Sequence, residues 1–334
     1  MKTFMVERYG DKAGVRAGEM PAPRVGADDV LVRIHAAGVN PLDLRLRDGD
    51  FKAILPYRLP LILGNDLAGV VVQVGSAVTR FAVGDEVYAR PGKDRIGTFA
   101  ELIAVHQDDV AIKPAALTME EAASLPLVAL TAWQALVERA HVQPGQKVLI
   151  HAGSGGVGTI AIQLAKHLGA HVATTASTAK ADLVKGLGAD VVVDYKQQAF
   201  ETVLDGYDVV LDTLGGETLE KSLQVLKPGG KVISIAGPPD AAFARELGAN
   251  AILRLTMSVL SFKIRRRAKR RNVTYSFLFM KASGAQLREL TPLIDAGKIR
   301  PVVDRVFPFA ETREAMQYVE KGRAKAGKVV VAMT

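Results

Sequence analysis

The segment Lys147-Val-Leu-Ile-His-Ala-Gly-Ser-Gly-Gly-Val-Gly158 joins a short aliphatic run to glycines 153, 155 and 158, in G-x-G-x-x-G spacing. The apolar residues that follow recur at helical intervals as far as Leu168, and Gly169 stands where a helix C-terminal glycine belongs. This pattern predicts a strand, a glycine turn and a helix whose first N–H groups face a pyrophosphate. The alternative is a glycine-rich turn that only packs the helix on the strand.

The next predicted strand, which starts at His171, bears on the choice of dinucleotide. An NAD site places Asp or Glu at the end of this strand to bind the ribose hydroxyls. No acid occurs from Val172 to Ala181. Hydroxyl groups and one cation stand there instead: Thr175, Ser177, Thr178 and Lys180. These groups suit a 2′-phosphate, so the sequence predicts NADPH as the cofactor, with a solvated lysine as the alternative reading of Lys180.

Length and composition limit the remaining possibilities. A chain of 334 residues favours two domains. It contains no cysteine, which excludes disulfides and thiolate zinc sites and fits a reducing compartment. The N-terminus has no signal-peptide h-region, and Arg254 interrupts the most apolar stretch, residues 251–262. We therefore expect a cytoplasmic protein with no membrane span.

The net charge of +8 comes almost entirely from the basic run Lys263–Arg271, which holds seven cations and no anion. The surface as a whole is therefore not built for nucleic acid. A solvated helical face is the preferred interpretation of the run. An RNA contact, an anionic surface and electrostatic attraction of NADPH remain open.

The pattern along the chain predicts two kinds of region, one rich in strands and one in which strands and helices alternate. Residues 1–121 read as closely spaced strands, which indicates a compact β domain, and the C-terminal part from Pro301 is similar. Thr118-Met-Glu-Glu121 is a capping box that opens a helical region. Strands and helices then alternate from Lys147 to Met280, which predicts an α/β fold with a doubly wound parallel sheet. Its last strand, Thr274–Met280, has an apolar edge and suggests a homodimer.

Several motifs together carry a resemblance to a known family. They are Ala36-Ala-Gly-Val-Asn-Pro-Leu-Asp43, Leu63-Gly-Asn-Asp-Leu-Ala-Gly69, Val83-Gly-Asp-Glu-Val87, Leu130-Thr-Ala-Trp133, Ala152–Gly158, Leu187-Gly-Ala-Asp190, Asp194-Tyr-Lys196 and Gly322-Arg-Ala-Lys-Ala-Gly-Lys328. With them the chain resembles the zinc-independent medium-chain dehydrogenases/reductases, in the NADPH:quinone oxidoreductase (ζ-crystallin-like) and enone reductase branch. The resemblance implies a GroES-like catalytic domain, residues 1–121 and 282–334, with a Rossmann domain, residues 122–281, inserted in it. It also implies that the nicotinamide lies in the cleft between the domains.

The resemblance also implies a set of cofactor-binding residues. The pyrophosphate would lie on Ser154, Gly155, Gly156, Val157 and Gly158. The 2′-phosphate would be met by Ser177, Lys180, Tyr195 and Arg323, and Thr131, Leu214 and Phe279 complete the set. Tyr195 as a strand-end aromatic, Arg323 as a surface arginine and Thr131 as a core threonine are the structural alternatives.

The same resemblance bears on metal. Zinc-dependent members of this fold place a Cys ligand where this chain has Asn40, and a His-Glu pair where it has Asn65-Asp66. The six histidines show no spacing that converges on a metal, so we expect none. Without a Lewis acid an alkoxide is poorly stabilised. Reduction of a quinone or a polarised C=C bond needs less stabilisation of negative charge, because that charge spreads into a hydroquinone or an enolate.

The catalytic residues are less sharply defined. Asn40 is the first candidate for a donor to the substrate carbonyl or a positioner of the nicotinamide side, although Asn before Pro is also a common turn residue. Tyr57 could line the pocket and donate a proton, with water as the alternative donor. Asp43 and Arg47 share one helix face, either as an exposed ion pair or as site residues. Phe277 and Phe279 could form an apolar floor or belong to the core.

The predicted activity is hydride transfer from NADPH to a quinone, with proximity and polarisation supplied by the protein. The first alternative is reduction of the C=C bond of an alkenal, an enone or a 2-haloacrylate. The second is an NADPH-binding structural or RNA-binding protein that uses the basic run and has little turnover.

Overall fold

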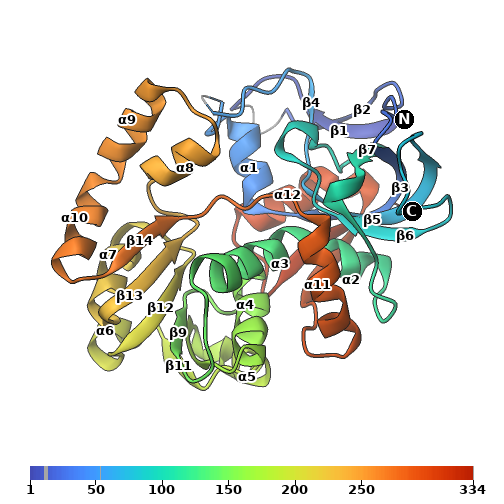
Figure 1. The fold of residues 1–334 in the computed structure, drawn as a ribbon. Coiled ribbons are helices and arrows are strands. Elements are labelled where there is room, and N and C mark those ends of the chain that lie inside the picture. Colours follow the sequence, from blue (N-terminus) through green and yellow to red (C-terminus); the bar gives the residue numbers. More distant parts are fainter. Residues whose placement is uncertain (11–13, 53, 334) are drawn as a thin grey trace. The chain divides into compact units, whose positions relative to one another are not determined.

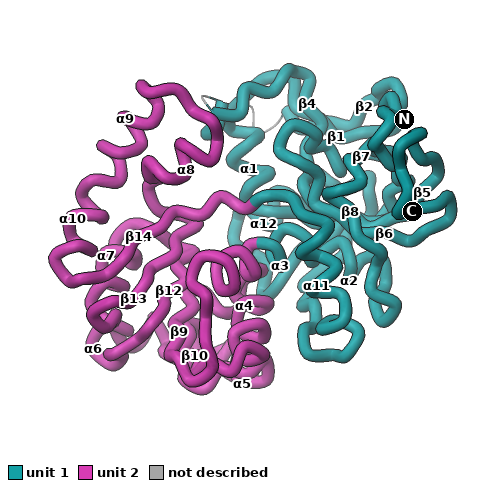
Figure 2. Tube along the Cα trace, in the orientation of Figure 1, with its two compact units in different colours: residues 1–130, 281–334 teal, residues 131–280 magenta. Residues whose placement is uncertain are grey.

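The computed structural model describes residues 1–10, 14–52 and 54–333. The chain forms two compact units, unit 1 (Met1–Leu130 with Lys281–Thr334) and unit 2 (Thr131–Met280), shown in Figure 2. Unit 1 is thus split in sequence by unit 2. The domain boundaries that we predicted at 121/122 and 281/282 stay a prediction.

Unit 2 is built on a six-stranded parallel sheet (Figure 1). Its strands are β9 (Lys147–Ile150), β10 (His171–Ala176), β11 (Val191–Asp194), β12 (Tyr207–Asp212), β13 (Leu226–Ser234) and β14 (Thr274–Phe277). They lie in the order β11-β10-β9-β12-β13-β14. Numbered along the chain this is 3-2-1-4-5-6, the order of dinucleotide-binding sheets, so the predicted doubly wound sheet is confirmed.

The central strand β9 explains why its sequence is apolar on both faces. Val148, Leu149 and Ile150 are buried, and β9 pairs with β10 on one side and with β12 on the other. A strand covered on both faces carries a continuous run of aliphatic residues. The chain order reverses across β9, and such a switch point opens a crevice at the carboxyl ends of the strands. The glycine turn begins at that point.

The helices of unit 2 are α4 (Gly156–His167), α5 (Ala181–Gly186), α6 (Phe200–Val203), α7 (Gly216–Val225), α8 (Ala241–Glu246), α9 (Ala251–Leu260) and α10 (Phe262–Arg270). A π-helical segment, Gln134–Arg139, precedes β9. The sequence analysis missed α8 and α9, although Asn250 is a typical N-cap residue whose side chain accepts a hydrogen bond from Leu253 N at 2.9 Å. Within the described residues, no helix has both the length and the apolar character required to cross a bilayer.

Unit 1 contains two sheets. The three-stranded sheet has β1 (Lys2–Val6) between β2 (Arg16–Glu19) and β4 (Leu61–Ile62). The larger sheet contains β3 (Asp29–Val39), β5 (Asp66–Val74), β6 (Glu86–Ala89), β7 (Leu102–His106), β8 (Val110–Ile112), β15 (Val303–Pro308) and β16 (Lys328–Ala332). The C-terminal strand β16 lies antiparallel to β3, with Val329 opposite Val39. This pairing brings Lys328 close to the residues that follow β3.

The helices of unit 1 are α1 (Pro41–Asp48), α2 (Met119–Ala123), α11 (Gly284–Asp295) and α12 (Thr312–Glu320), and α3 (Pro126–Trp133) runs across the boundary between the units. The predicted capping box opens α2. The Thr118 hydroxyl accepts a hydrogen bond from Glu121 N at 3.2 Å, and the Glu121 carboxylate accepts one from Thr118 N at 3.0 Å. This prediction is confirmed.

Candidate active site

The glycine turn after β9 needs glycine for steric reasons. A Cβ on Gly158 would lie 2.3 Å from Ala152 O and 2.7 Å from Gly153 Cα, both of them backbone atoms. A Cβ on Gly153 would lie 2.1 Å from Thr174 Oγ1 of β10. The start of α4 therefore approaches the end of β9 more closely than any residue with a side chain allows.

The first turn of α4 is left open. Gly155 is its N-cap residue, and no side chain caps the helix. Ser154, Gly155, Gly156 and Val157 are partly exposed, whereas Gly158 is buried. Open amides at a helix N-terminus, reached without a Cβ in the way, fit the pyrophosphate of a dinucleotide.

His151, which directly precedes the glycine turn, is fully buried. Its Nε2 lies 2.9 Å from Ser222 Oγ of α7, its Nδ1 lies 3.3 Å from Thr175 Oγ1, and its ring meets the Phe200 ring edge-on. Burial lowers the pKa of His151 to about 4. Thr175, a hydroxyl that we expected beside the 2′-phosphate, is instead buried and also accepts a hydrogen bond from Ala152 N.

Acid should weaken the protein through His151. Its pKa is about 4 in the folded state and near 6.5 when unfolded, so between these values only the unfolded chain takes up the proton. We expect this group to remove up to about 3 kcal/mol of stability as the pH falls from 6.5 to 4. Urea unfolding of wild type and His151→Gln over this range measures the effect. Parallel curves for the two proteins would show that the imidazole is not responsible.

Four of the predicted cofactor residues follow strands of unit 2 by one or two positions. Ser177 comes after β10, Tyr195 after β11, Leu214 after β12 and Phe279 just beyond β14. Carboxyl ends of parallel strands meet at one edge of a sheet, so these residues share the edge that carries the glycine turn. Tyr195 is 60% exposed and Leu214 is 54% exposed, which leaves large apolar surfaces uncovered at that edge. Thr131, on α3, is buried.

An acid that the sequence analysis did not consider lies near the expected phosphate position. The Asp194 carboxylate accepts hydrogen bonds from the Thr178 hydroxyl, from Thr178 N at 2.8 Å and from Lys196 N at 2.9 Å. The Thr178 hydroxyl and these amides lower the pKa of Asp194, so it stays ionised. Among the described residues Lys180 has no acidic partner, so its ammonium is not neutralised by Asp194.

A second missed acid, Asp212, shapes two of the strand ends. It is fully buried at the end of β12, where Oδ1 accepts from Leu214 N at 3.1 Å and Gly215 N at 3.0 Å. Its Oδ2 accepts a 2.5 Å hydrogen bond from Ser234 Oγ. One carboxylate therefore fixes the turns after β12 and β13. Its position as the last residue of a predicted strand was the available signal.

Unit 1 contains a buried polar cluster, which we define as Asn40, Asp43, Asn65, Asp66 and Lys328. Each member is at most 6% exposed. Asn40 N donates to Asp43 Oδ2 at 2.7 Å, and Asn65 Nδ2 donates to Asp43 Oδ1 at 2.7 Å. Lys328 Nζ donates to Asp66 Oδ2 at 3.1 Å and also to Asn40 Oδ1. A buried ammonium thus lies between Asn40 and a carboxylate.

The side chain of Asn40 is fully engaged within this cluster. Its Nδ2 donates to Asp66 Oδ2 at 2.8 Å and to Gly38 O at 3.4 Å, while Oδ1 accepts from Lys328. Contact with a substrate carbonyl would require one of these bonds to be exchanged.

Burial shifts the pKa of one member of this cluster, Asp43, and of Arg90 beside it. Burial raises the pKa of Asp43 to about 6, against the hydrogen bonds from Asn65 and Asn40 and the charge of Lys328. Burial also lowers the pKa of Arg90, whose Nη2 reaches Asn65 Oδ1 at 3.4 Å and whose Nε has no hydrogen-bond partner among the described residues. The sequence analysis did not identify Arg90.

The interpretation of Asp43 and Arg47 as an exposed ion pair is wrong. Both side chains are buried, and they bond to different partners. Arg47 Nη2 lies 2.9 Å from Glu320 Oε1 of α12, and Arg47 Nε lies 2.8 Å from Asp48 Oδ1. Arg47 therefore ties α1 to α12 within unit 1.

Tyr57 and Arg323 also belong to unit 1. The Tyr57 hydroxyl donates to Lys93 O at 2.6 Å, and burial raises its pKa to about 12, so it keeps its proton at neutral pH. Arg323 follows α12 and is exposed. In the described part of the chain, no three His, Cys, Asp or Glu side chains gather as a metal-ligating group.

Sequence comparison identifies two domain families. Residues 26–115 match the alcohol dehydrogenase GroES-like domain, and residues 187–331 match the zinc-binding dehydrogenase family. The mitochondrial NAD(P)H oxidoreductase RTN4IP1 of Danio rerio is 37% identical over 100% of this chain and 91% of its own length. The chloroplastic NADPH-dependent alkenal/one oxidoreductase of Arabidopsis thaliana is 37% identical over 99% of this chain and 79% of its own.

Structural comparison gives a consistent result. The quinone oxidoreductase from Coxiella burnetii superposes with a TM-score of 0.87 at 30% identity, over 100% of this chain and 99% of its own. Relatives that differ in the acceptor they reduce therefore share both domains with this chain.

Proposed function

The chain belongs to the medium-chain dehydrogenase/reductase family as a nicotinamide-dependent oxidoreductase, and from this premise we propose that it transfers hydride from NADPH to a quinone. The observation that carries the proposal is the glycine turn at the switch point of the unit 2 sheet, beside an open helix N-terminus. When bound, the cofactor supplies the hydride. The protein supplies orientation and a polar environment around the reacting groups.

The choice of NADPH is supported by the end of β10. Ser177, Thr178 and Lys180 follow this strand, and Asp194 accepts hydrogen bonds from Thr178 and from Lys196 N. Because the Thr178 hydroxyl already donates to Asp194, a phosphate at this position would meet the Ser177 hydroxyl and the Lys180 ammonium. Tyr195 and Arg323 complete the proposed phosphate site.

Replacing Lys180 with glutamate should lower kcat/KM for NADPH by about 100-fold, because an attractive contact to the phosphate becomes a repulsive one. The value for NADH should change far less, since the 2′-hydroxyl carries no charge. Steady-state kinetics with both cofactors measures the ratio. Lys185→Glu makes the same charge change at an exposed position of α5 and is the matched control. An equal loss with NADPH and NADH would remove Lys180 from the phosphate site.

The proposed reaction needs no zinc. Three cluster residues stand where zinc-dependent members have the Cys ligand and the His-Glu pair, and two of them, Asn40 and Asp66, bond to the Lys328 ammonium. A fixed positive charge there disfavours a second cation by electrostatic repulsion. This supports zinc-independent chemistry even though residues 187–331 match a family described as zinc-binding. Metal analysis of the purified protein and the effect of a chelator on turnover test it.

Asn40 and Tyr57 have different proposed roles. Since the Asn40 side chain is engaged by Asp66, Gly38 and Lys328, we assign it the positioning of the nicotinamide side. Tyr57 keeps its proton at neutral pH and is the proposed proton donor, provided that it exchanges its bond to Lys93 O for one to the substrate oxygen. A Tyr57→Phe variant with unchanged kcat would transfer this role to water.

A panel of acceptors distinguishes quinone reduction from its alternative. NADPH oxidation is followed with benzoquinones, 2-alkenals and 2-haloacrylates, and kcat/KM is compared. A higher value for benzoquinones supports the proposal. A higher value for the alkenals or haloacrylates would assign the chain to double-bond reduction, an alternative favoured by its similarity to the alkenal/one oxidoreductase.

We also propose a homodimer and a cytoplasmic location. β14 forms one edge of the unit 2 sheet, where an unpaired strand can add a second copy. Light scattering on the eluted protein measures the mass, and a monomer would refute pairing at this edge.

A further inference from the structure

Helix α9 carries an apolar stripe that faces away from its own core. Ile252, Leu255, Val259 and Phe262, which opens α10, are spaced by three and four residues and so share one face. They are 78%, 68%, 66% and 60% exposed. On the opposite face Met257 is buried. α9 therefore packs on the rest of unit 2 through the face that carries Met257, and the stripe takes no part in that packing.

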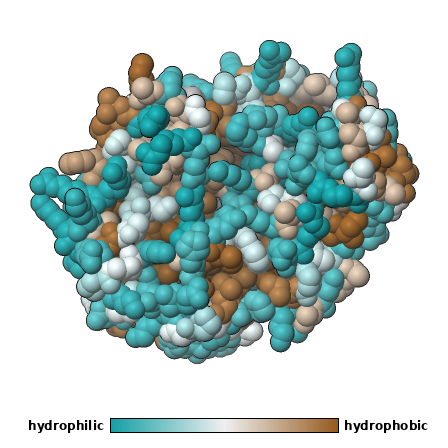
Figure 3. Space-filling model, in the orientation of Figure 1, coloured by the Kyte–Doolittle hydropathy of each residue, from teal (hydrophilic) through white to brown (hydrophobic). Residues whose placement is uncertain are grey.

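The stripe is a patch rather than a scatter of single residues. Leu260 is 57% exposed, so five of the twelve exposed large hydrophobic residues in the described chain fall within residues 252–262. In Figure 3, brown side chains cover the α9 region, and teal side chains project beside them over α10. An apolar patch of this kind marks a surface that contacts something else.

Helix α10 adds positive charge directly to the apolar stripe. Seven cations lie between Lys263 and Arg271, with no acid among them. Glu220 of α7 binds two of them, Lys263 at 2.8 Å and Arg267. Among the described residues, no ion pair joins an acid to Arg266, Lys269, Arg270 or Arg271. Arg266 and Arg270 follow Phe262 by four and eight residues and continue the stripe on the same face.

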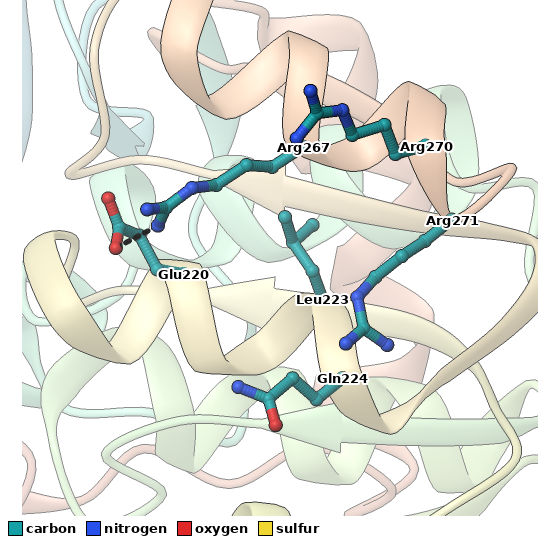
Figure 4. A pocket seen from close by; sticks show the side chains of 6 residues that line it. All are labelled: Glu220, Leu223, Gln224, Arg267, Arg270 and Arg271. Atoms are coloured by element: carbon teal, nitrogen blue, oxygen red, sulfur yellow. Dashed lines mark hydrogen bonds and ion pairs between the residues drawn. The ribbon is translucent and has the colours of Figure 1, made fainter.

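Three of these arginines border a pocket of about 290 Å³ between α7 and α10. Figure 4 shows Arg267, Arg270 and Arg271 around it, with Leu223 and Gln224 on the side of α7. The lining contains three arginines and one carboxylate, Glu220, which pairs with Arg267, so the pocket carries a net positive charge. Guanidinium groups with an amide nearby suit a phosphate oxygen.

We propose that α9 and α10 form a docking surface for an anionic lipid bilayer. The apolar stripe enters the interfacial layer, and the cations of α10 contact lipid phosphates, with one headgroup in the arginine pocket. A second copy of the chain on this face would bring two basic runs together, and RNA would leave the apolar stripe unused. A bilayer with anionic lipids offers an apolar layer to the stripe of α9 and phosphates to the cations of α10. The docking does not depend on which acceptor the enzyme reduces.

Vesicle binding tests the proposal with the full-length protein. Co-sedimentation is measured with phosphatidylcholine vesicles and with vesicles containing about 30% phosphatidylglycerol, at about 0.1 M NaCl. We expect binding to the anionic vesicles only, and its loss at about 0.5 M NaCl, where screening is strong. NADPH turnover with a water-soluble acceptor confirms that each protein is folded.

Two variants separate the apolar and the charged halves of the surface. Arg266→Gln/Arg270→Gln and Leu255→Ser/Val259→Ser change only exposed residues. Each should weaken vesicle binding by at least about tenfold. Lys185→Gln/Lys298→Gln removes two exposed cations outside this surface and should bind as wild type.

Other occupants of the surface give different results. Equal binding to neutral and anionic vesicles, or binding that both variants retain, would overturn the proposal. So would RNA retention on a filter without vesicle binding. A molecular mass that falls in Leu255→Ser/Val259→Ser, again without vesicle binding, would assign the face to a second copy.

Discussion

Replacing Gly158 with alanine is expected to lower the affinity for NADPH by about 100-fold, or about 3 kcal/mol. The added Cβ would lie 2.3 Å from Ala152 O and 2.7 Å from Gly153 Cα. Both are backbone atoms of the turn, so relief requires α4 to move away from β9. That movement displaces the first-turn amides from the pyrophosphate. Calorimetric titration with NADPH measures the loss, and circular dichroism checks the fold.

Gly186 provides the matched control for this substitution. It ends α5, and a Cβ there would meet nothing within 4 Å. Gly186→Ala should bind NADPH as wild type does and gain up to about 1 kcal/mol of stability from helix propensity. Wild-type affinity in Gly158→Ala would mean that the close approach of helix and strand is not needed for binding.

The parts of the fold that could be predicted are those with local signals. The strand–glycine turn–helix at Lys147–Leu168 and the capping box at Thr118 are fixed by residues close together in sequence. The alternation that follows predicts a parallel sheet, because each strand needs a helix to return the chain. Ser177 could be placed near the glycine turn because it follows the second strand, whereas Tyr195 and Leu214 were expected only from the family resemblance.

The buried polar cluster had no such signal. Asn40, Asp66 and Lys328 come from three distant segments, and they meet because β3 pairs with β16 on one side and with β5 on the other. A lysine at the start of a C-terminal strand reads as a surface residue from sequence. Arg47 was misread in the same way, since its partner Glu320 is 273 residues away. Long-range pairing, rather than local pattern, decided which of these charges are buried.

Replacing Lys328 with methionine should cost about 3–5 kcal/mol of stability at neutral pH. Methionine keeps an apolar stem of similar length but removes the ammonium, leaving the Asp66 carboxylate buried without a countercharge. Asn40 would keep its bond to Asp66 but lose the donor to its Oδ1. Urea unfolding of wild type and variant measures the difference.

The double variant Lys328→Met/Asp66→Asn tests whether the interaction between these two side chains accounts for the loss of stability. Asparagine at position 66 can still accept from Leu127 N, which now reaches Asp66 Oδ1 at 2.7 Å. Its NH2 group then takes the place of Asp66 Oδ2, which faces Asn40 Nδ2, so the Asn40 amide must turn over to accept from it, and the loss of Lys328 frees its Oδ1 to do so. We expect the double variant to recover most of the lost stability, because the carboxylate of Asp66, which Lys328 neutralises in the wild type, is no longer present. Additive losses would show that the two side chains stabilise the fold independently.

The pH dependence of the Lys328→Met deficit distinguishes charge from packing. Lys328 lowers the pKa of Asp43, which is about 6 when the ammonium is present, so its removal raises that pKa further. A carboxyl whose folded pKa lies above its unfolded value near 4 binds its proton more readily in the folded state, so stability returns as the pH falls between these values. Below about pH 6 both proteins gain this stability alike, so the deficit should be largest above pH 7, shrink as the pH falls to about 6 and then stay level. A deficit of the same size above pH 7 and below pH 6 would instead assign the loss to altered packing of the methionine side chain.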